Sequence, residues 1–438
     1  MAGYIVVSGL FQYRVWTHPT SVIAGLGGLT TGDNVSAMWL LAWTPHALTH
    51  HIDPLYSRVL SFPTGSDIAW NPLSPLLGLF GWPFLLLGGP ALDYNVVMTL
   101  GMAATAWAGY LSVCHWVKSR ALGIFGGLLL LASPYVYGQS LAHPSLAVFP
   151  TLPLSAIALH EAWGRRRWNV ARAGLALGAC WLGVLLISTE MFGSLALMTG
   201  VLAVCCGLYH RTTWRSWWKR ATQTTVIGIA TVLPYVGFLL WGMLRLPGRI
   251  IRQTIDPATH AGTLLNFVSP NSSRFVGLKT VEGLGVVEEG LYVGIPILIL
   301  LIWGLWRTRC STVAAAWCAV AAAAAVLALG PQLLIGGHRF PLPEAALTHM
   351  PLGGEFVPLR FGLYVSLAVA MAVPLLVDGL RQGARASAGG RLALHRRIGL
   401  ALLLILGIAS WVPRLPPTVA VGPTPAALAD RVQRAIVR

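Results

Sequence analysis

The chain has 438 residues, of which 55% are hydrophobic and only 10% are charged. A soluble domain carries about 25% charged residues, so this composition excludes an ordinary soluble protein, and the high apolar content excludes a disordered one. The net charge of +16 is also typical of nucleic-acid-binding proteins. Here, however, the basic residues fall in short segments between apolar runs, which is the pattern of a membrane protein. The six cysteines lie in or beside apolar runs, so we expect no disulfide framework.

Apolar runs predict the transmembrane helices, because a helix needs about 20 apolar residues to cross the hydrocarbon core. Ten clear runs lie at 92–117, 121–138, 145–163, 171–189, 191–208, 222–244, 291–306, 311–330, 357–380 and 397–412. Met1–Phe11 adds an eleventh candidate that would be the end of a longer first helix. The predicted fold class is therefore all-α, a polytopic membrane protein with about eleven transmembrane helices in residues 1–412. Residues 413–438 form a short extracytoplasmic C-terminal tail.

One further apolar stretch, Pro72–Leu87, is interrupted by three prolines and has no flanking basic residue. Prolines break the backbone hydrogen-bond ladder of a helix, and a span is normally flanked by basic residues on one side. We therefore expect an interfacial or re-entrant helix that does not cross the membrane.

Basic and acidic residues separate onto opposite sides of the predicted bundle. More than half of the 30 Lys and Arg residues fall in short loops, which by the positive-inside rule face the cytoplasm. These loops are at 118–120, 165–172, 211–220, 307–309 and 381–397. All acidic residues except Glu161 and Asp378 then lie on the outer side, most of them in the loops at 12–71, 246–290 and 331–356. Any chemistry is expected on the extracytoplasmic side of the cell membrane.

The first outer loop holds the strongest candidate for a catalytic residue. Asp33 precedes a Trp-containing amphipathic stretch, 35–50, which we expect to lie in the membrane interface. An Asp in this position can cap the helix by accepting hydrogen bonds from free amides. It can also act as a general base for a hydroxyl nucleophile at the membrane surface. The two roles are compatible.

Several motifs together resemble a known family. They are GDNVSAMWLLAWTPHAL in the first outer loop, GPALDYN at a helix start, SPYVYGQSLAHPSL, EEGLYVGIPILIL, and the segment from Leu329 to Phe361. In this order they resemble the bacterial multi-pass glycosyltransferases of the GT-C superfamily. The resemblance implies a polyprenyl-phosphate sugar donor and a glycan or lipid acceptor outside the membrane. It also implies that Asp33 is the base or the acceptor-binding carboxylate.

Two arginines are candidates for binding the donor phosphate. Arg360 lies just inside a predicted helix, where an arginine either extends toward the interface or grips a phosphate with its planar fork. Arg339 offers a second cation. In the resemblance His143 also contacts the donor phosphate, although it can equally cap a turn. Glu289 and Asp53 complete the predicted substrate-binding set, with helix-dipole stabilisation as the alternative for Glu289.

No metal site is predicted. His46 and His50 are spaced to share one helix face near Asp53, but zinc needs three or four ligands. A divalent cation remains a weak alternative, and no phosphate-binding loop or dinucleotide fingerprint occurs.

The sequence therefore favours a membrane glycosyltransferase that contacts membrane lipids and no nucleic acid. A lipid or small-molecule transporter or flippase is the alternative, because prolines such as Pro153, Pro234 and Pro296 interrupt the spans. No internal repeat supports it. A non-catalytic assembly protein is the third class.

Overall fold

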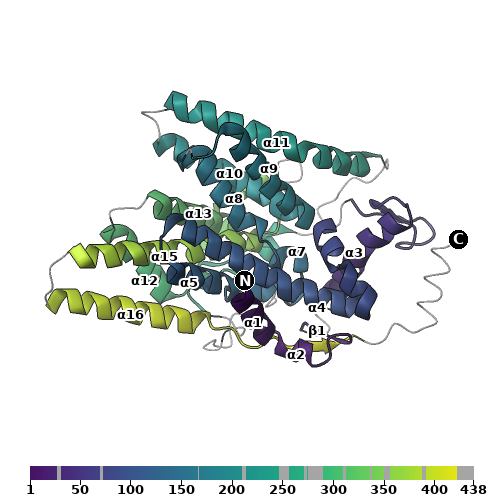
Figure 1. The fold of residues 1–438 in the computed structure, drawn as a ribbon, viewed down its shortest axis with the longest axis horizontal. Helices are drawn as coiled ribbons and strands as arrows, with labels where there is room; N and C mark the ends of the chain where they lie inside the picture. Colours follow the sequence, from purple (N-terminus) through teal and green to yellow (C-terminus); the bar gives the residue numbers. More distant parts are fainter. Residues whose placement is uncertain are drawn as a thin grey trace.

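The structure is a computed structural model of a helical bundle (Figure 1). It describes residues 1–26, 31–69, 73–165, 167–209, 214–245, 256–270, 274, 290–308, 312–335, 338–349, 356–386 and 391–421. Its α-helices are α1 (Ala2–Phe11), α2 (Tyr13–Trp16), α3 (Thr31–Thr49), α4 (Pro75–Trp116), α5 (Arg120–Leu131), α6 (Pro134–Gln139), α7 (Pro144–Ala147), α8 (Thr151–Leu159), α9 (Val170–Ile187), α10 (Thr189–Tyr209), α11 (Trp214–Leu244), α12 (Ile295–Arg307), α13 (Thr312–Ala328), α14 (Glu344–Leu347), α15 (Gly362–Ala386) and α16 (Arg391–Trp411). A π-helical turn, His160–Arg165, continues α8, and 3-10 helices occupy Pro257–His260, Leu264–Phe267 and Pro358–Phe361.

Each of the ten predicted apolar runs contains helix in the structure. Six helical segments of the described chain are long and apolar enough to cross a membrane, so the count of about eleven spans is not confirmed. They are Pro75–Trp116, Pro144–Arg165, Val170–Ile187, Thr189–Tyr209, Trp217–Leu244 and Pro358–Gly383. The shorter apolar helices include α1, α5, α12 and α13.

Prolines divide two of the predicted runs into shorter helices. Run 121–138 becomes α5 and α6, because Pro134 begins a new helix whose cap is the Ser133 side chain. Run 145–163 becomes α7 and α8, with an extended residue at Val148 between them. Nearly all residues from 133 to 149 are buried. Irregular backbone at membrane depth is stable only when protein covers it, and this segment meets that condition.

The stretch predicted as a separate interfacial helix is joined to the next helix. α4 runs without a loop from Pro75 to Trp116 and is broken at Gly88 and Gly89, whose φ and ψ angles are not helical. Gly89 has φ 77°, a conformation that favours glycine, and Pro90 starts the second half. At about 1.5 Å per residue the first half reaches only about 20 Å, which is too short to cross the hydrocarbon core. That this half does not cross stays a prediction.

Three small antiparallel sheets add to the predicted all-α bundle. They pair β1 (Val22–Ala24) with β6 (Thr418–Ala420), β2 (Tyr56–Ser57) with β3 (Ser66–Asp67), and β4 (Gln332–Ile335) with β5 (His338–Pro341). The β1–β6 pair joins the first loop to the C-terminal segment, with Val22 opposite Ala420. Such pairing leaves no local signal in the sequence, which is why it was not predicted.

The two ends of the bundle differ in character. One end of the bundle carries α3, β1 and β6 and lies at the right in Figure 1. We call it the loop end. There Arg274 is fully buried and donates to the carbonyls of Ala132 and Trp411, at the ends of α5 and α16. A cation at two helix C-termini satisfies their free carbonyls. The basic end lies opposite and carries the π-turn and the arginines Arg165 and Arg220.

The centre of the bundle is α15. It is mostly buried and packs against α13, α5, α12 and α4 (Figure 1). Burial on all sides is expected of a helix that is apolar around its whole circumference, and α15 has no charged residue between Gly362 and Val377. α9 and α11 pack against each other at the edge of the bundle, with α10 beside α9. α13, which packs against α15, also contacts α10.

Candidate active site

Asp33 lies at the start of α3 and is accessible. The helix begins at Thr31, so Asp33 lies inside its first turn and is not the N-cap residue that the sequence suggested. Its side chain is 60% exposed, and its Oδ2 lies 3.7 Å from Nε2 of His143. A carboxylate in the first helical turn is favoured by the helix dipole. The structure therefore brings two of the predicted site residues together.

The neighbouring Asn34 holds this turn in place. It is buried, and its amide nitrogen lies within hydrogen-bond distance of the Ala24 carbonyl, the Tyr94 hydroxyl and the Leu141 carbonyl, at 2.9–3.3 Å. Asn95, next to Tyr94, donates to the carbonyls of Pro19 and Val22. The Tyr and Asn of the GPALDYN motif thus fasten the first loop to α4, and the sequence analysis did not assign them this role.

His143 precedes α7 and is oriented from both sides. Its Nδ1 lies 2.8 Å from Oε1 of Gln139, which is an acceptor, so Nδ1 carries a proton. Nε2 then faces Asp33, and protonation of this second nitrogen would complete an ion pair with the carboxylate. His143 is therefore placed to orient Asp33.

Arg360 is paired with a carboxylate that the sequence left unassigned. Its Nη1 lies 2.5 Å from Oε2 of Glu190, and the two side chains are 21% and 25% exposed. Arg360 comes from the 3-10 helix Pro358–Phe361, and Glu190 from the first turn of α10. Two side chains that are 170 positions apart give no local signal of contact. In the sequence, the two residues share only their position next to the end of an apolar run.

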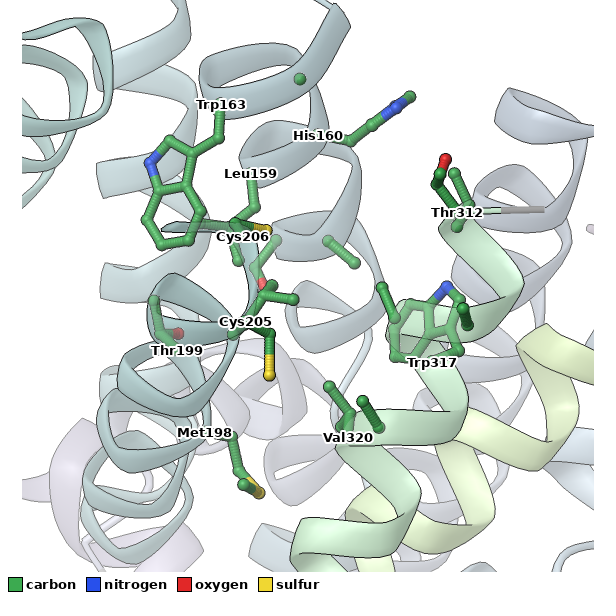
Figure 2. Close-up of a pocket in the computed structure, with 18 of the residues that line it drawn as sticks. Leu159, His160, Trp163, Met198, Thr199, Cys205, Cys206, Thr312, Trp317 and Val320 are labelled. Atoms are coloured by element: carbon green, nitrogen blue, oxygen red, sulfur yellow. The ribbon is translucent and has the colours of Figure 1, made fainter. Parts of the chain in front are cut away.

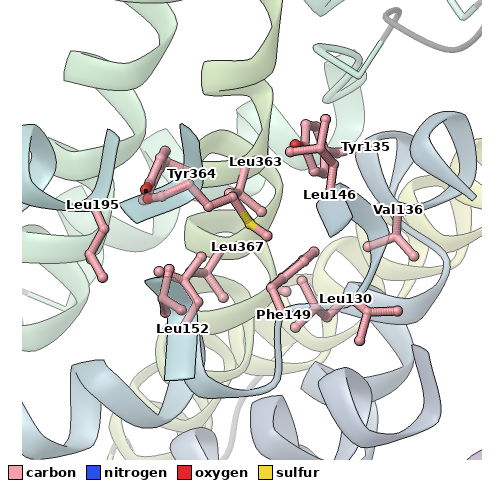
Figure 3. Close-up of a cluster of buried hydrophobic side chains, with 14 of the residues drawn as sticks. Leu130, Tyr135, Val136, Leu146, Phe149, Leu152, Leu195, Leu363, Tyr364 and Leu367 are labelled. Carbon is pink, nitrogen blue, oxygen red and sulfur yellow. Dashed lines mark hydrogen bonds between the residues drawn. The ribbon is translucent and has the colours of Figure 1, made fainter. Parts of the chain in front are cut away.

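The short helix α7 connects the two pairs. His143 lies at its start, and Leu146 lines the same small pocket as Glu190, Arg360 and Tyr135. Figure 3 shows Leu146 beside Leu363 and Tyr135, above a cluster of buried leucines. The packed core beneath gives α7 a rigid support. The residue that pairs with Asp33 and a residue of the Arg360 pocket thus belong to one buried turn.

Two other predicted residues have contacts or positions away from this site, and a third is not described. Asp53 forms an ion pair with Arg245, whose guanidinium lies over the Trp241 ring, and it also accepts from its own loop's backbone. Asp53 therefore joins the first loop to the end of α11, and its predicted role in substrate binding has no support in these contacts. Arg339 lies on the exposed strand β5. Glu289 lies outside the described residues.

His46 of α3 and His50, just after the helix, lie next to each other with tilted rings. The rings of His46 and His50 are 4.1 Å apart, and Nδ1 of His50 bonds the His46 carbonyl at 2.9 Å. Burial, and to a smaller extent His50, lowers the pKa of His46 below its ordinary value. No group of three or more possible metal ligands occurs among the residues that the structure describes.

No protein-family model and no curated protein matches the chain. Several solved structures are similar to it. The arabinofuranosyltransferase AftD from Mycobacteria shares 16% identity at a TM-score of 0.46, covering 98% of this chain and 28% of AftD. ArnT from Cupriavidus metallidurans, bound to undecaprenyl phosphate, shares 11% at 0.48, covering 94% and 70%.

The oligosaccharyltransferase of Archaeoglobus fulgidus shares 10% identity at a TM-score of 0.47, covering 95% of this chain and 56% of its own. The chain thus spans little more than a quarter of AftD and about half of the oligosaccharyltransferase. Each of these three TM-scores is below 0.5, so the likeness concerns the arrangement of the helices alone.

Proposed function

We propose that the protein transfers a sugar from a polyprenyl-phosphate donor to a hydroxyl group of an extracytoplasmic acceptor, at the loop end of the bundle. The observation that carries this proposal is that α7 is next to both pairs: His143, the partner of Asp33, precedes it, and its Leu146 lines the small pocket of Glu190 and Arg360. One pair offers an accessible carboxylate and the other an arginine at the edge of an apolar bundle. The sequence motifs that resemble the GT-C superfamily support the same assignment.

The reaction needs opposite charges at its two ends. The acceptor oxygen attacks the anomeric carbon while the bond from that carbon to the phosphate oxygen breaks, and the electron pair leaves with the phosphate. Asp33 takes the proton of the acceptor hydroxyl, and His143 keeps its carboxylate in position. Arg360 binds the phosphate and stabilises the charge that develops on it. Glu190 neutralises Arg360 until the donor arrives.

The test is transfer from a polyprenyl-phosphate sugar by the purified full chain and its Asp33→Asn variant. Asn keeps the shape of Asp and its ability to accept hydrogen bonds but is not basic. We expect transfer to fall by about 10²–10⁴-fold, the usual contribution of a general base, while the melting temperature changes little. Asp378→Asn, in α15 near Gln382, removes a carboxylate from the opposite end and should leave transfer unchanged.

Transfer by Asp33→Asn at the wild-type rate would contradict the assignment of Asp33 as the base. An equal loss of transfer in Asp378→Asn would show that the assay responds to lost stability. If neither the wild-type chain nor any variant transfers sugar, while donor is translocated across proteoliposomes, the transporter alternative is favoured instead.

A further inference from the structure

A large apolar pocket opens at the basic end, away from the proposed transfer site. It has a volume of about 670 Å³ and lies between the π-turn, α10, α13 and α15. Figure 2 shows Trp163, His160 and Thr312 around one end of it and Met198 and Val320 toward the other. Ligand pockets usually measure about 300–1,000 Å³, so this one is large enough for a sizeable part of a lipid chain.

The pocket is separated from the proposed donor site at its deep end. Tyr364 lines the large pocket, whereas Ser194 lines the small pocket that contains Glu190 and Arg360. The two hydroxyl groups are hydrogen-bonded at 2.9 Å, and both residues are buried. A molecule in the large pocket therefore reaches it from the basic end or from the side, and does not share the arginine.

The mouth of the pocket offers donors to an anion. The indole nitrogen of Trp116 can only donate, and it donates to Nδ1 of His160 at 3.1 Å. Neutral His160 then carries its proton on Nε2, which is bonded to no described residue. Arg165 also lines the pocket; it is exposed, and one of its five N–H groups is engaged, with the His115 carbonyl.

One carboxylate lies near this mouth. Glu161 follows His160 in the π-turn and is 3% exposed. It lies 3.7 Å from Nε2 of His115 and accepts from the backbone amide of Arg167. The carboxylate of Glu161 is therefore buried and interacts with His115 and with the amide of Arg167. The accessible groups at the mouth are donors and cations.

We propose that this pocket binds the hydrocarbon chain of an anionic phospholipid from the leaflet at the basic end, with the lipid phosphate at His160 and Arg165. Basic pockets between transmembrane helices bind lipid head groups in this manner, and the charge at the mouth selects an anionic lipid over a zwitterionic one. The site does not depend on the proposed transfer reaction. The bound lipid would fill the pocket between α10 and α13.

The experiment is native mass spectrometry of the full chain in detergent with added phosphatidylglycerol or phosphatidylcholine. Two variants of α13 form a matched pair. Ala319 lines the pocket, whereas Ala322 is exposed on another face of the helix and does not line it. Ala319→Trp fills the space and should abolish retained lipid, while Ala322→Trp should retain phosphatidylglycerol as the wild type does.

A second pair of variants tests the head group. Arg165→Ala and His160→Ala should each weaken retention of phosphatidylglycerol, the arginine variant by about tenfold, the usual effect of a lost hydrogen bond to a charged group. Equal retention by Ala319→Trp and Ala322→Trp would overturn the pocket as the binding site. Equal retention of the two lipids by the wild type would overturn the anionic head group. Lipid binding is measured without sugar transfer, so failure here and failure of the proposed function are distinguishable.

Discussion

The charged groups of the loop end and those of the basic end are used differently. At the loop end, two accessible or partly exposed charged groups pair with side chains: Glu190 with Arg360, and Asp33 with His143. At the basic end, Arg220 is bound to the backbone, as the buried Arg274 is at the loop end. The guanidinium of Arg220 donates to three carbonyls, those of Glu161, Ala162 and Trp168, at 2.6–3.3 Å.

This difference indicates where a ligand can bind. A side-chain pair that is partly exposed can exchange one partner for a ligand of the same charge at modest cost. An arginine bonded to several backbone carbonyls cannot do so without leaving them unsatisfied, which costs about 1–3 kcal/mol for each buried group. The loop end is therefore the place for exchange, and Arg220 holds the π-turn, α9 and α11 together. Substitutions at the two ends should affect different measurements.

The largest expected effect on donor binding is that of Arg360→Lys. Lysine keeps the charge but loses the planar fork that binds a phosphate through two hydrogen bonds. We expect the KM for the polyprenyl-phosphate donor to rise by about 10- to 100-fold, corresponding to the about 1.5–3 kcal/mol of a charged hydrogen bond, with a smaller change in kcat.

Steady-state kinetics of donor titration measures this effect. Arg14→Lys, an exposed arginine of α2, is the control and should leave the KM unchanged. A fall in kcat at constant KM would contradict the assignment of Arg360 to donor binding and would leave it only the stabilisation of the developing charge.

The corresponding change at the basic end is Arg220→Lys. Lysine cannot reach three carbonyls with one planar group, so we expect a loss of about 1–3 kcal/mol in stability and an unchanged donor KM. Thermal unfolding in detergent, followed by circular dichroism, measures the loss. Arg215→Lys, exposed on the same helix, should behave as the wild type. A raised donor KM without a lower melting temperature would remove the distinction between the two ends.

Hydropathy predicted the helices well, because a long apolar run at membrane depth has few alternatives to an α-helix. It did not predict that the stretch Pro72–Leu87 is joined to the next helix through Gly88–Gly89, or that the run 121–138 is divided before Pro134. Nor could it predict the pairing of β1 with β6, since those strands come from opposite ends of the chain.

The candidate site was predicted in part. The sequence proposed both Asp33 and His143, and the structure places the two side chains next to each other. The sequence could not identify Glu190 as the partner of Arg360, because a turn residue between two apolar helices is equally compatible with a solvated position. It assigned Asp53 to the substrate because it could not show that Arg245 neutralises that carboxylate. Contacts between distant loops decide which charge is accessible, and they depend on the packed fold.

The smallest expected effect is that of Glu190→Gln, and its sign is the sharpest test of exchange at the loop end. A bound phosphate competes with the Glu190 carboxylate for Arg360 and is repelled by it. Two like charges about 4 Å apart in water cost about 1 kcal/mol, so removing one should lower the donor KM by about fivefold. The same titration as for Arg360→Lys measures it. Glu190→Asp, which keeps the charge, should stay close to the wild-type KM. A donor KM that rises in Glu190→Gln, as in Arg360→Lys, would contradict this exchange. Glu190 and Arg360 would then stay paired when the donor binds, as Arg220 stays bonded to its three carbonyls.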